Sequence, residues 1–453
     1  MKIVVAGCGK VGTSVTASLV REGHDVLVID NRNDVIEEII NIYDVMAVCG
    51  SAADFDTLAE AGADKAEIFV SVTGSDEVNL IACHLAKKMG ASHAIARVRN
   101  PEYNDKSLAF MKQSLGISAM VNPELFAAQE LFNILKIPAA MNVESFSGRN
   151  LELVEMVIKE GSPLDGMSLI DLRRKYNAQY LVSAVMRGEE TYIPDGSFVL
   201  KGGDRIGVTA ASYEVQRLLK MLGMVQKQAR SVMILGASTT AFYLSQMLAQ
   251  GGNKVKVIEK DPDRAAEFAA KLPPDVVLIR GDGAQEELLL EEGIKEVDAF
   301  VSLTGMDEEN ILISYFASTQ EVPKVIAKVN RDELAVIAEK LGLETVISPR
   351  KIVSDIIASY ARAVGNSLGS NVETLYHLMN DSIEALEFKV ANEFRGAKIP
   401  LKDLKLKPDI LITGITRGRK AIIPSGEDMI LPGDRVIAVV AGQQLSDLED
   451  ILA

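Results

Sequence analysis

Residues 2–30 read KIVVAGCGKVGTSVTASLVREGHDVLVID, and this stretch decides the fold. It begins with a β-branched run, turns at Gly7-x-Gly9-x-x-Gly12, continues with helical periodicity and ends in a second β-branched run at Asp30. A glycine loop between a strand and a helix is typical of doubly wound sheets, because the first N–H groups of the helix face a bound phosphate. The stretch therefore predicts a dinucleotide-type βαβ unit. The alternative is a glycine turn that packs a helix and holds no ligand.

The stretch occurs twice, because residues 231–259 read SVMILGASTTAFYLSQMLAQGGNKVKVIE. Two further blocks repeat at nearly the same offset: 66–79 corresponds to 297–310, and 186–206 corresponds to 416–436. Repeats at a constant offset indicate a duplicated chain. The order of the blocks predicts four domains, large, small, large and small, over residues 1–137, 138–226, 227–366 and 367–453.

Each large unit alternates short apolar strands with helical patterns, as in the expected strand 67–74 and the expected helix 79–90. This alternation predicts an α/β fold with a parallel, doubly wound sheet. Each large unit ends in a long amphipathic helix after a proline, over 123–137 and 349–364. We expect these two helices to cross to a partner and not to close the core of their own unit. The small units mix strands and helices, so we expect two Rossmann-like domains, each followed by a small α+β domain.

The candidate site residues lie in the glycine loop and at the carboxyl ends of the strands, where open α/β sheets bind ligands. Asp30 is placed to accept hydrogen bonds from ribose hydroxyls and to repel a 2′-phosphate, which favours NAD or a plain adenine nucleotide over NADP. Arg32 weakens this inference, since it attracts the same phosphate. The residue types and positions select Gly7, Gly9, Gly12, Asp30, Gly50, Ser51, Thr73, Gly74 and Arg97, and the predicted site includes their neighbours Cys8, Val11 and Asn31.

The second glycine loop, residues 236–241, keeps only its first glycine. Ser238 stands where Gly9 stands in the first loop, and its side chain crowds the space of a pyrophosphate. Lys328 replaces Arg97 and lacks the bidentate fork that suits phosphate. We therefore expect the first site to bind nucleotide tightly and the second to be empty or to take a weaker, different ligand.

The composition excludes several functional classes. The net charge is −15, which argues against coating nucleic acid or an anionic membrane. No run of 18 apolar residues is present, so no transmembrane helix is expected. The three cysteines contain no CxxC pair, which excludes a disulfide framework and a cysteine zinc site and fits a reducing cytosol. The four histidines form no catalytic pattern, so neither catalytic nor metal-binding residues are predicted.

The glycine loop, SVTGSDEVN (71–79), ARVRNPEY (96–103) and the GDRI sequence (203–206) of the small unit together resemble the RCK (regulator of potassium conductance) family. The resemblance implies a cytoplasmic gating ring, a homotetramer, on the inner face of the cell membrane beneath a potassium channel subunit of the TrkH type. It implies that NAD or NADH and ATP or ADP bind as regulatory ligands and are not turned over. It also adds Lys10 to the nucleotide-binding residues.

The residues themselves favour a binding module over an enzyme. A dehydrogenase needs an acid or a base beside the nicotinamide, and no further large domain supplies one. A nucleotide sensor needs only different affinities for two conformations. Two alternatives remain, an NAD-linked oxidoreductase and a stand-alone nucleotide sensor without a channel.

Overall fold

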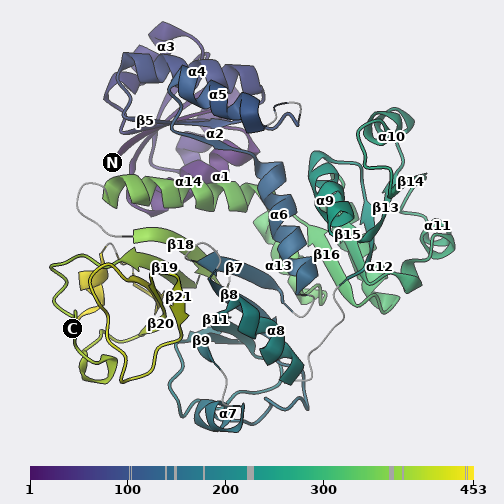
Figure 1. Ribbon diagram of the computed structural model, residues 1–453. Helices are drawn as coiled ribbons and strands as arrows, with labels where there is room; N and C mark the ends of the chain where they lie inside the picture. Colours follow the sequence, from purple (N-terminus) through teal and green to yellow (C-terminus); the bar gives the residue numbers. More distant parts are fainter. Residues whose placement is uncertain are drawn as a thin grey trace. The chain divides into compact units, whose positions relative to one another are not determined.

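The computed structural model describes residues 1–101, 103, 105–137, 140–146, 150–176, 179–221, 229–366, 372–379, 382–443, 445 and 447–453. These residues form two compact units, and each unit takes segments from both halves of the chain (Figure 1). The first, which we call the Rossmann-type unit, contains Met1–Leu131 and Ser231–Ala361. The second, the small-domain unit, contains Phe132–Arg230 and Arg362–Ala453. The predicted domain boundaries at 138, 226, 227 and 367 fall outside the described residues and stay predictions.

The first Rossmann-type domain has a six-stranded sheet in the order β3-β2-β1-β4-β5-β6, with all neighbouring strands parallel. Its strands are β1 (Lys2–Ala6), β2 (Asp25–Asp30), β3 (Met46–Cys49), β4 (Ile68–Ser71), β5 (His93–Arg97) and β6 (Ala119–Val121). Its helices are α1 (Lys10–Arg21), α2 (Asn33–Ile42), α3 (Phe55–Glu60), η1 (Ala63–Lys65), α4 (Asp76–Met89), α5 (Asp105–Leu115) and α6 (Pro123–Lys136). This order is the doubly wound arrangement that the glycine loop predicts.

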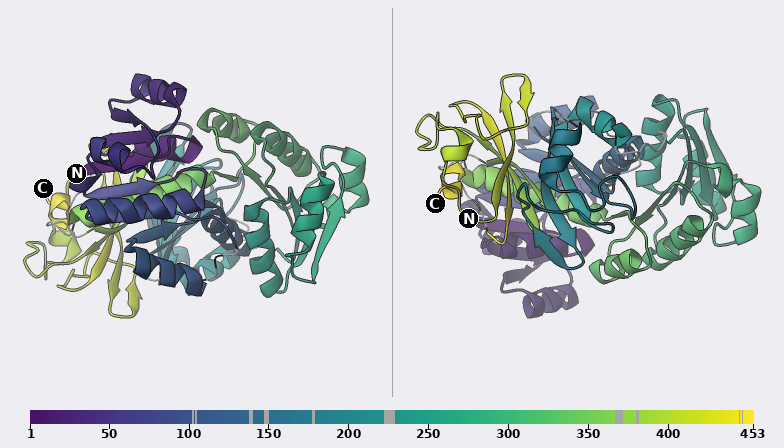
Figure 2. Two further views of the ribbon diagram at one scale, coloured as in Figure 1. Left: turned by 90° about the horizontal axis from the view of Figure 1, so that it is seen from above. Right: turned by 90° about the horizontal axis from the view of Figure 1, so that it is seen from below.

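The second Rossmann-type domain repeats the same order as β14-β13-β12-β15-β16-β17. Its strands are β12 (Ser231–Leu235), β13 (Lys254–Glu259), β14 (Val276–Arg280), β15 (Ala299–Ser302), β16 (Lys324–Lys328) and β17 (Val346–Ile347). Its helices are α9 (Thr239–Gln250), α10 (Pro262–Ala269), α11 (Glu286–Glu291), η2 (Ile294–Glu296), α12 (Asp307–Thr319), α13 (Asp332–Lys340) and α14 (Pro349–Asn366). Figure 2 shows the helices of this domain on both faces of its sheet.

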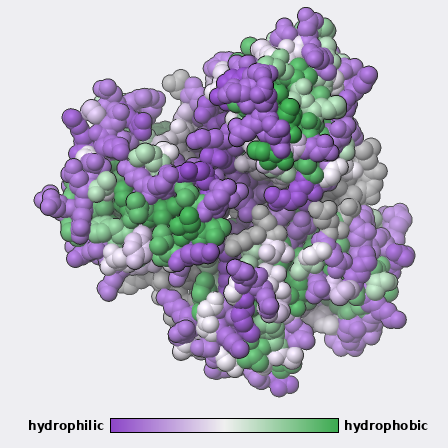
Figure 3. All heavy atoms as spheres, turned by 180° about the vertical axis from the view of Figure 1, so that it is seen from behind, coloured by the Kyte–Doolittle hydropathy of each residue, from purple (hydrophilic) through white to green (hydrophobic). Residues whose placement is uncertain are grey.

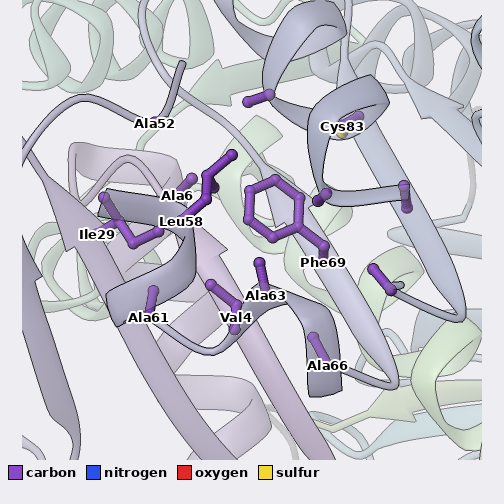
Figure 4. Packing of buried hydrophobic residues seen from close by; sticks show 14 of the residues in the cluster. Val4, Ala6, Ile29, Ala52, Leu58, Ala61, Ala63, Ala66, Phe69 and Cys83 are labelled. Carbon is purple, nitrogen blue, oxygen red and sulfur yellow. The ribbon is translucent and has the colours of Figure 1, made fainter. Parts of the chain in front are cut away.

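The central strands β1, β2 and β4 of the first domain are largely buried, and they are runs rich in Val, Ile and Ala, as expected for parallel strands covered by helices. Phe69 of β4 is fully buried and lies among Val4, Leu58 and Ala63 (Figure 4). The thiol of Cys83 is also fully buried there and lies 3.2 Å from the carbonyl oxygen of Ile95. Burial raises the pKa of this thiol, so Cys83 is a small core residue.

The terminal helix of the second domain packs on the first domain. Ser354 of α14 donates a hydrogen bond of 2.9 Å to the carbonyl oxygen of Ser14 in α1. Tyr360 of α14 lies with its hydroxyl 2.9 Å from Nδ1 of His93, and Figure 1 shows α14 beside α1. Helix α14 therefore leaves its own domain, as predicted, but it packs on the other half of the same chain and not on a second chain.

The small-domain unit contains two antiparallel five-stranded sheets of the same topology, ordered β10-β9-β11-β8-β7 and β18-β19-β22-β20-β21. The first small domain consists of β7 (Asn142–Phe146), β8 (Leu151–Val157), α7 (Leu169–Tyr176), β9 (Tyr180–Arg187), β10 (Glu190–Tyr192), β11 (Arg205–Ala211) and α8 (Ser212–Met221). The second consists of β18 (Val372–Leu378), β19 (Ile383–Lys389), η3 (Leu401–Asp403), β20 (Ile410–Arg417), β21 (Lys420–Ile422), β22 (Arg435–Ala441) and η4 (Leu448–Ile451).

The repeated GDR sequence of the small domains has a structural explanation. Arg187 donates two hydrogen bonds of 2.7 Å to the buried carboxylate of Asp204. Arg417 and Asp434 form the same bidentate pair in the second small domain. In each pair an arginine at the end of one strand holds the aspartate of the GDR sequence, which lies just before β11 or β22. The aspartate of GDR therefore has a structural role in the small domains.

Candidate functional site

The three glycines of the first loop have different surroundings. Gly7 has φ +96°, and a Cβ there would lie 2.8 Å from the backbone of Thr73. A Cβ on Gly12 would lie 1.7 Å from the carbonyl oxygen of Gly7. A Cβ on Gly9 would meet no atom within 4 Å. Gly7 and Gly12 are therefore required for packing, whereas Gly9 leaves free space in front of the N-terminus of α1.

Asp30 holds the glycine loop from the end of β2. Its Oδ2 accepts a hydrogen bond of 2.7 Å from the N–H of Cys8, and its Oδ1 accepts one of 3.0 Å from the N–H of Arg32. The Arg32 Nε lies 3.8 Å from the same carboxylate, on an exposed side chain. The carboxylate is thus fixed at the position where an acid meets ribose hydroxyls.

The end of β4 is held by Asn79, a fully buried residue of α4. Its Oδ1 accepts hydrogen bonds from the N–H and the hydroxyl of Thr73 at 2.8 and 2.7 Å. Its Nδ2 donates to the carbonyl oxygen of Arg97 at 2.9 Å, which joins the ends of β4 and β5. The sequence analysis gives Asn79 no role. Its recurrence as Asn310, with the same bonds to Thr304 and Lys328, is the signal that identifies it.

Arg97 is largely buried, with 12% of its side chain exposed, and burial lowers the pKa of its guanidinium. One terminal nitrogen lies 3.6 Å from Oε1 of Glu124 in the first turn of α6. Its Nε has no hydrogen-bond partner among the described residues. A buried cation with an unsatisfied donor favours an anionic ligand. The sequence does not single out Glu124. The only sign of its position is that VNPE (121–124) in the first half corresponds to ISPR (347–350) in the second.

The loop residues line a cavity of about 760 Å³ between the two halves of the Rossmann-type unit. The structure brings together all the predicted site residues in its lining except Cys8 and Gly12. Cys8 is buried, and burial raises the pKa of its thiol to about 12, so it acts through its N–H and not as a reactive thiolate. Gly12 lies beneath Gly7. The second half of the chain contributes Ser238, Thr239, Thr240, Lys328, Asn330, Pro349 and Arg350 to the wall, a contribution that the sequence does not predict.

The charges of the cavity suit an anion, although the chain as a whole is acidic. The charged residues of its lining are the cations Lys10, Arg32, Arg97, Lys328 and Arg350 and the carboxylates Asp30 and Glu124. Burial lowers the pKa of Lys328, whose ammonium donates to a carbonyl oxygen at 3.3 Å. The N-termini of α1 and α9 both reach this cavity and add partial positive charge. The cavity can therefore hold a ligand with several phosphate charges.

The second domain keeps the framework of the loop and changes its phosphate end. Gly236 has φ +93°, and Glu259 accepts a hydrogen bond of 2.8 Å from the N–H of Ala237, as Asp30 does in the first domain. Ser238, however, accepts a hydrogen bond of 3.3 Å from the N–H of Ala241 and so caps α9 with its own hydroxyl. The first helix α1 has no such side-chain cap.

No metal site or membrane span is found in the part of the chain that the structure describes. Within the described ranges, no three or more His, Cys, Asp or Glu side chains lie together as metal ligands. Every helix there is too short or too polar to cross a bilayer. His84 and His93 lie in structural hydrogen bonds, with their Nδ1 atoms 2.9 Å from Leu115 O and from the Tyr360 hydroxyl.

Two family models match the chain twice each. The TrkA-N domain matches residues 3–123 and 232–349, and the TrkA-C domain matches residues 153–223 and 386–453. The Trk system potassium uptake protein TrkA homolog of Archaeoglobus fulgidus is 34% identical over 451 residues, which is all of both chains. TrkA of Vibrio alginolyticus is 29% identical, over 99% of this chain and 98% of its own.

Solved structures show the same fold. The crystal structure of the GsuK RCK domain has a TM-score of 0.63 at 17% identity and covers 97% of this chain and 92% of its own. The GsuK channel bound to NAD has a TM-score of 0.64 at 16% identity and covers 97% of this chain and 77% of its own. The predicted resemblance to RCK domains is confirmed for the fold.

Proposed function

Because the chain belongs to the family of the Trk system potassium uptake protein TrkA, we propose that it is a nucleotide-binding regulatory subunit of a Trk-type potassium uptake channel. It binds adenine nucleotides as signals and does not turn them over. The observation that carries this proposal is the cation-lined cavity of about 760 Å³ at the glycine loop. A cavity at the carboxyl ends of parallel strands is where doubly wound folds hold nucleotides.

The ligands are ATP or ADP and NAD or NADH. Asp30 receives the ribose, the free space at Gly9 receives the phosphates next to α1, and the cationic Arg97 on the cavity wall attracts phosphate charge. One structure with the same fold is described as bound to NAD, and another of the same channel is described as bound to ADP. Both ligands contain the adenosine and pyrophosphate that these groups suit.

The cavity also gives binding a mechanical consequence. Its walls belong to two domains, with Gly9 and Arg97 on one side and Ser238, Lys328 and Arg350 on the other. A nucleotide that contacts both walls favours the arrangement in which they lie at the right distance, and a shorter nucleotide favours it less. Differential affinity of this kind shifts a conformational equilibrium without chemistry.

The partner of this subunit is an integral-membrane channel subunit of the TrkH type, and the chain acts as a homotetramer on the inner face of the membrane. The relatives' names place them in a potassium uptake system. Within the described residues no helix is long and apolar enough to cross a bilayer. An NAD-linked oxidoreductase is the competing function, and turnover of NADH by the purified chain would support it.

The test is calorimetric titration of the intact chain with ATP, ADP and NAD, with Asp30→Ala and Glu259→Ala as matched variants. Both substitutions remove a carboxylate that holds a glycine-loop N–H, at 2.7 and 2.8 Å. We expect Asp30→Ala to weaken all three ligands alike, by about 10- to 100-fold for lost hydrogen bonds to a charged group. Glu259→Ala should leave the affinities unchanged. Equal losses in both variants, or none in either, would contradict the assignment of the first loop.

A further inference from the structure

The two crevices differ at a pair of positions that face each other. In the first crevice, Asn31 and Val78 line the open cavity. Their counterparts in the second domain are Lys260 and Glu309, at the repeat offsets of the strands and helices that carry them. The Lys260 ammonium lies 3.2 Å from Oε1 of Glu309. In the second domain a salt bridge therefore joins the two positions that line the open cavity in the first, and its Lys260 side chain is 53% exposed.

Lys260 interacts with more than one carboxylate. The pKa of its ammonium is raised, chiefly by the hydrogen bond and the charge of Glu309 and further by the charges of Asp282 and Glu259. These acids come from the end of β13, the loop after β14 and the first turn of α12. The first crevice has Ser51 where the second has Asp282, so the second contains two additional carboxylates.

The phosphate end of the second crevice is also filled by the chain itself. Ser238 accepts the hydrogen bond of the Ala241 N–H, a donor that a glycine loop leaves for phosphate. A nucleotide entering here would have to displace the Ser238 hydroxyl and break the Lys260 bridge, and it would lie beside the additional carboxylates Glu309 and Asp282. These acids carry the same sign of charge as the nucleotide, which opposes binding.

We propose that Lys260, with Glu309 and Ser238, is a built-in substitute for nucleotide that disfavours ligand binding at the second glycine loop. The inference rests on the proposed function, because it concerns which of two homologous crevices senses nucleotide. The second domain then has a single state, and the first crevice alone responds to ligand. The tethered ammonium neutralises the acids of the crevice, and the serine hydroxyl satisfies the N-terminus of α9.

The experiment exchanges the residues of the second crevice for those of the first. The full variant contains Ser238→Gly, Ala241→Gly, Lys260→Asn, Asp282→Ser and Glu309→Val, and a milder variant contains Lys260→Asn with Glu309→Val alone. Lys271→Asn is the matched control, because Lys271, just after α10, also forms an exposed salt bridge in this domain, to Glu267 of α10 at 2.9 Å. Each full-length protein is titrated with ATP and with NAD, and its thermal unfolding is recorded.

We expect one tight nucleotide site per chain in the wild type and in Lys271→Asn, and two in the full exchange. The milder variant should show a second, weaker site. Two equal sites in the wild type would overturn the inference, as would a single site in both exchange variants while they unfold cooperatively. If the wild type binds no nucleotide but the full exchange binds one, the proposed function fails and this inference stands. If neither protein binds, both fail.

Discussion

Gly9 and Gly12 show how the same residue type serves binding at one position and packing at another. A Cβ at Gly9 would face open space, whereas a Cβ at Gly12 would overlap the carbonyl oxygen of Gly7. The absence of a side chain at Gly9 is therefore unexplained by the fold. It is explained by a ligand whose phosphates approach the backbone there.

Gly9→Ala is thus expected to separate binding from stability. The added methyl meets no protein atom, so the free energy of unfolding should change by no more than about 0.5 kcal/mol. The methyl fills the phosphate space, so ATP affinity should fall by about 10-fold or more, which corresponds to about 1.4 kcal/mol. Calorimetry and thermal unfolding of the same sample measure both quantities. Gly12→Ala is the contrasting variant and should lose stability as well, and a Gly9→Ala protein that binds ATP normally would contradict the site.

The sequence predicts where the glycine-loop residues of the first domain lie, because the conformation of such a loop depends on neighbouring residues only. A strand, a turn and a helix within 30 residues determine where Gly9 and Asp30 lie. It does not predict Lys328 or Arg350 as wall residues of the same cavity. Their place depends on how two domains pack, which involves contacts between residues more than 200 positions apart.

Helices α6 and α14, which end the two Rossmann-type domains, contribute to the contact between these domains. Some of their charged side chains are removed from solvent. Glu130 of α6 lies in a desolvated position near Asp355 of α14. Burial, together with repulsion from Asp355, raises the pKa of the Glu130 carboxyl to about 7, and Lys351 opposes the shift. The proline and the apolar stripes of these helices are evident in the sequence, but the meeting of two acids is not.

Glu130 should make stability depend on pH near neutrality. A carboxyl whose pKa is raised in the folded state stabilises that state when it is protonated. Its contribution to the free energy of unfolding is complete below the unfolded pKa of about 4.3 and is lost as pH rises through about 7. We expect the free energy of unfolding to fall by on the order of 2 kcal/mol between pH 5 and pH 8 from this group. Denaturant titrations at both pH values measure it.

Glu130→Gln is the variant that isolates this effect. The amide is neutral at every pH, so the difference in stability between pH 5 and pH 8 should shrink relative to the wild type. Glu37→Gln, on the exposed face of α2, is a control that should leave the difference unchanged. An identical pH dependence in the wild type and Glu130→Gln would show that this carboxyl is already ionised at pH 5.

At the scale of the whole molecule, the predicted homotetramer matters most, because the proposed gating ring depends on it. The crossing of α14 is satisfied inside the chain, since Ser354 and Tyr360 contact the first domain. The packing of α14 therefore does not require a second chain. Other surfaces have to form the interfaces of the predicted tetramer. Apolar side chains remain exposed on the second Rossmann-type domain, among them Leu312 and Val336. Figure 3 shows hydrophobic side chains gathered in patches on one face of the molecule.

We expect a homotetramer at micromolar concentration. Light scattering coupled to gel filtration should give four times the 49.0 kDa of one chain. Leu312→Asp tests whether the apolar area of α12 takes part, since an aspartate there costs nothing in an exposed position and disfavours burial in an interface. A monomer for the wild type at this concentration would refute the proposed ring.

The two domains contribute different residues to the binding of one ligand. A wall residue from the second half of the chain can test this. Arg350 stands in the second half where Glu124 stands in the first, and both line the same cavity. A nucleotide held at Gly9 and Asp30 directs its phosphates away from the ribose end, so only a longer phosphate chain should reach Arg350. Burial lowers the pKa of this guanidinium, and a phosphate partner would offset the cost of its burial.

Arg350→Ala should therefore weaken ATP by about 10-fold, within the range of a charge-assisted hydrogen bond, and leave AMP unchanged. Lys271→Ala is the matched control, because Lys271 belongs to the same domain and pairs with Glu267 on the surface, outside the cavity lining. Competition binding with the full chain measures all four affinities. If ATP and AMP weaken equally, Arg350 acts on the fold and not on the phosphates. If neither changes, Arg350 does not contact the ligand, and any contact from the second half has to come from other wall residues such as Lys328.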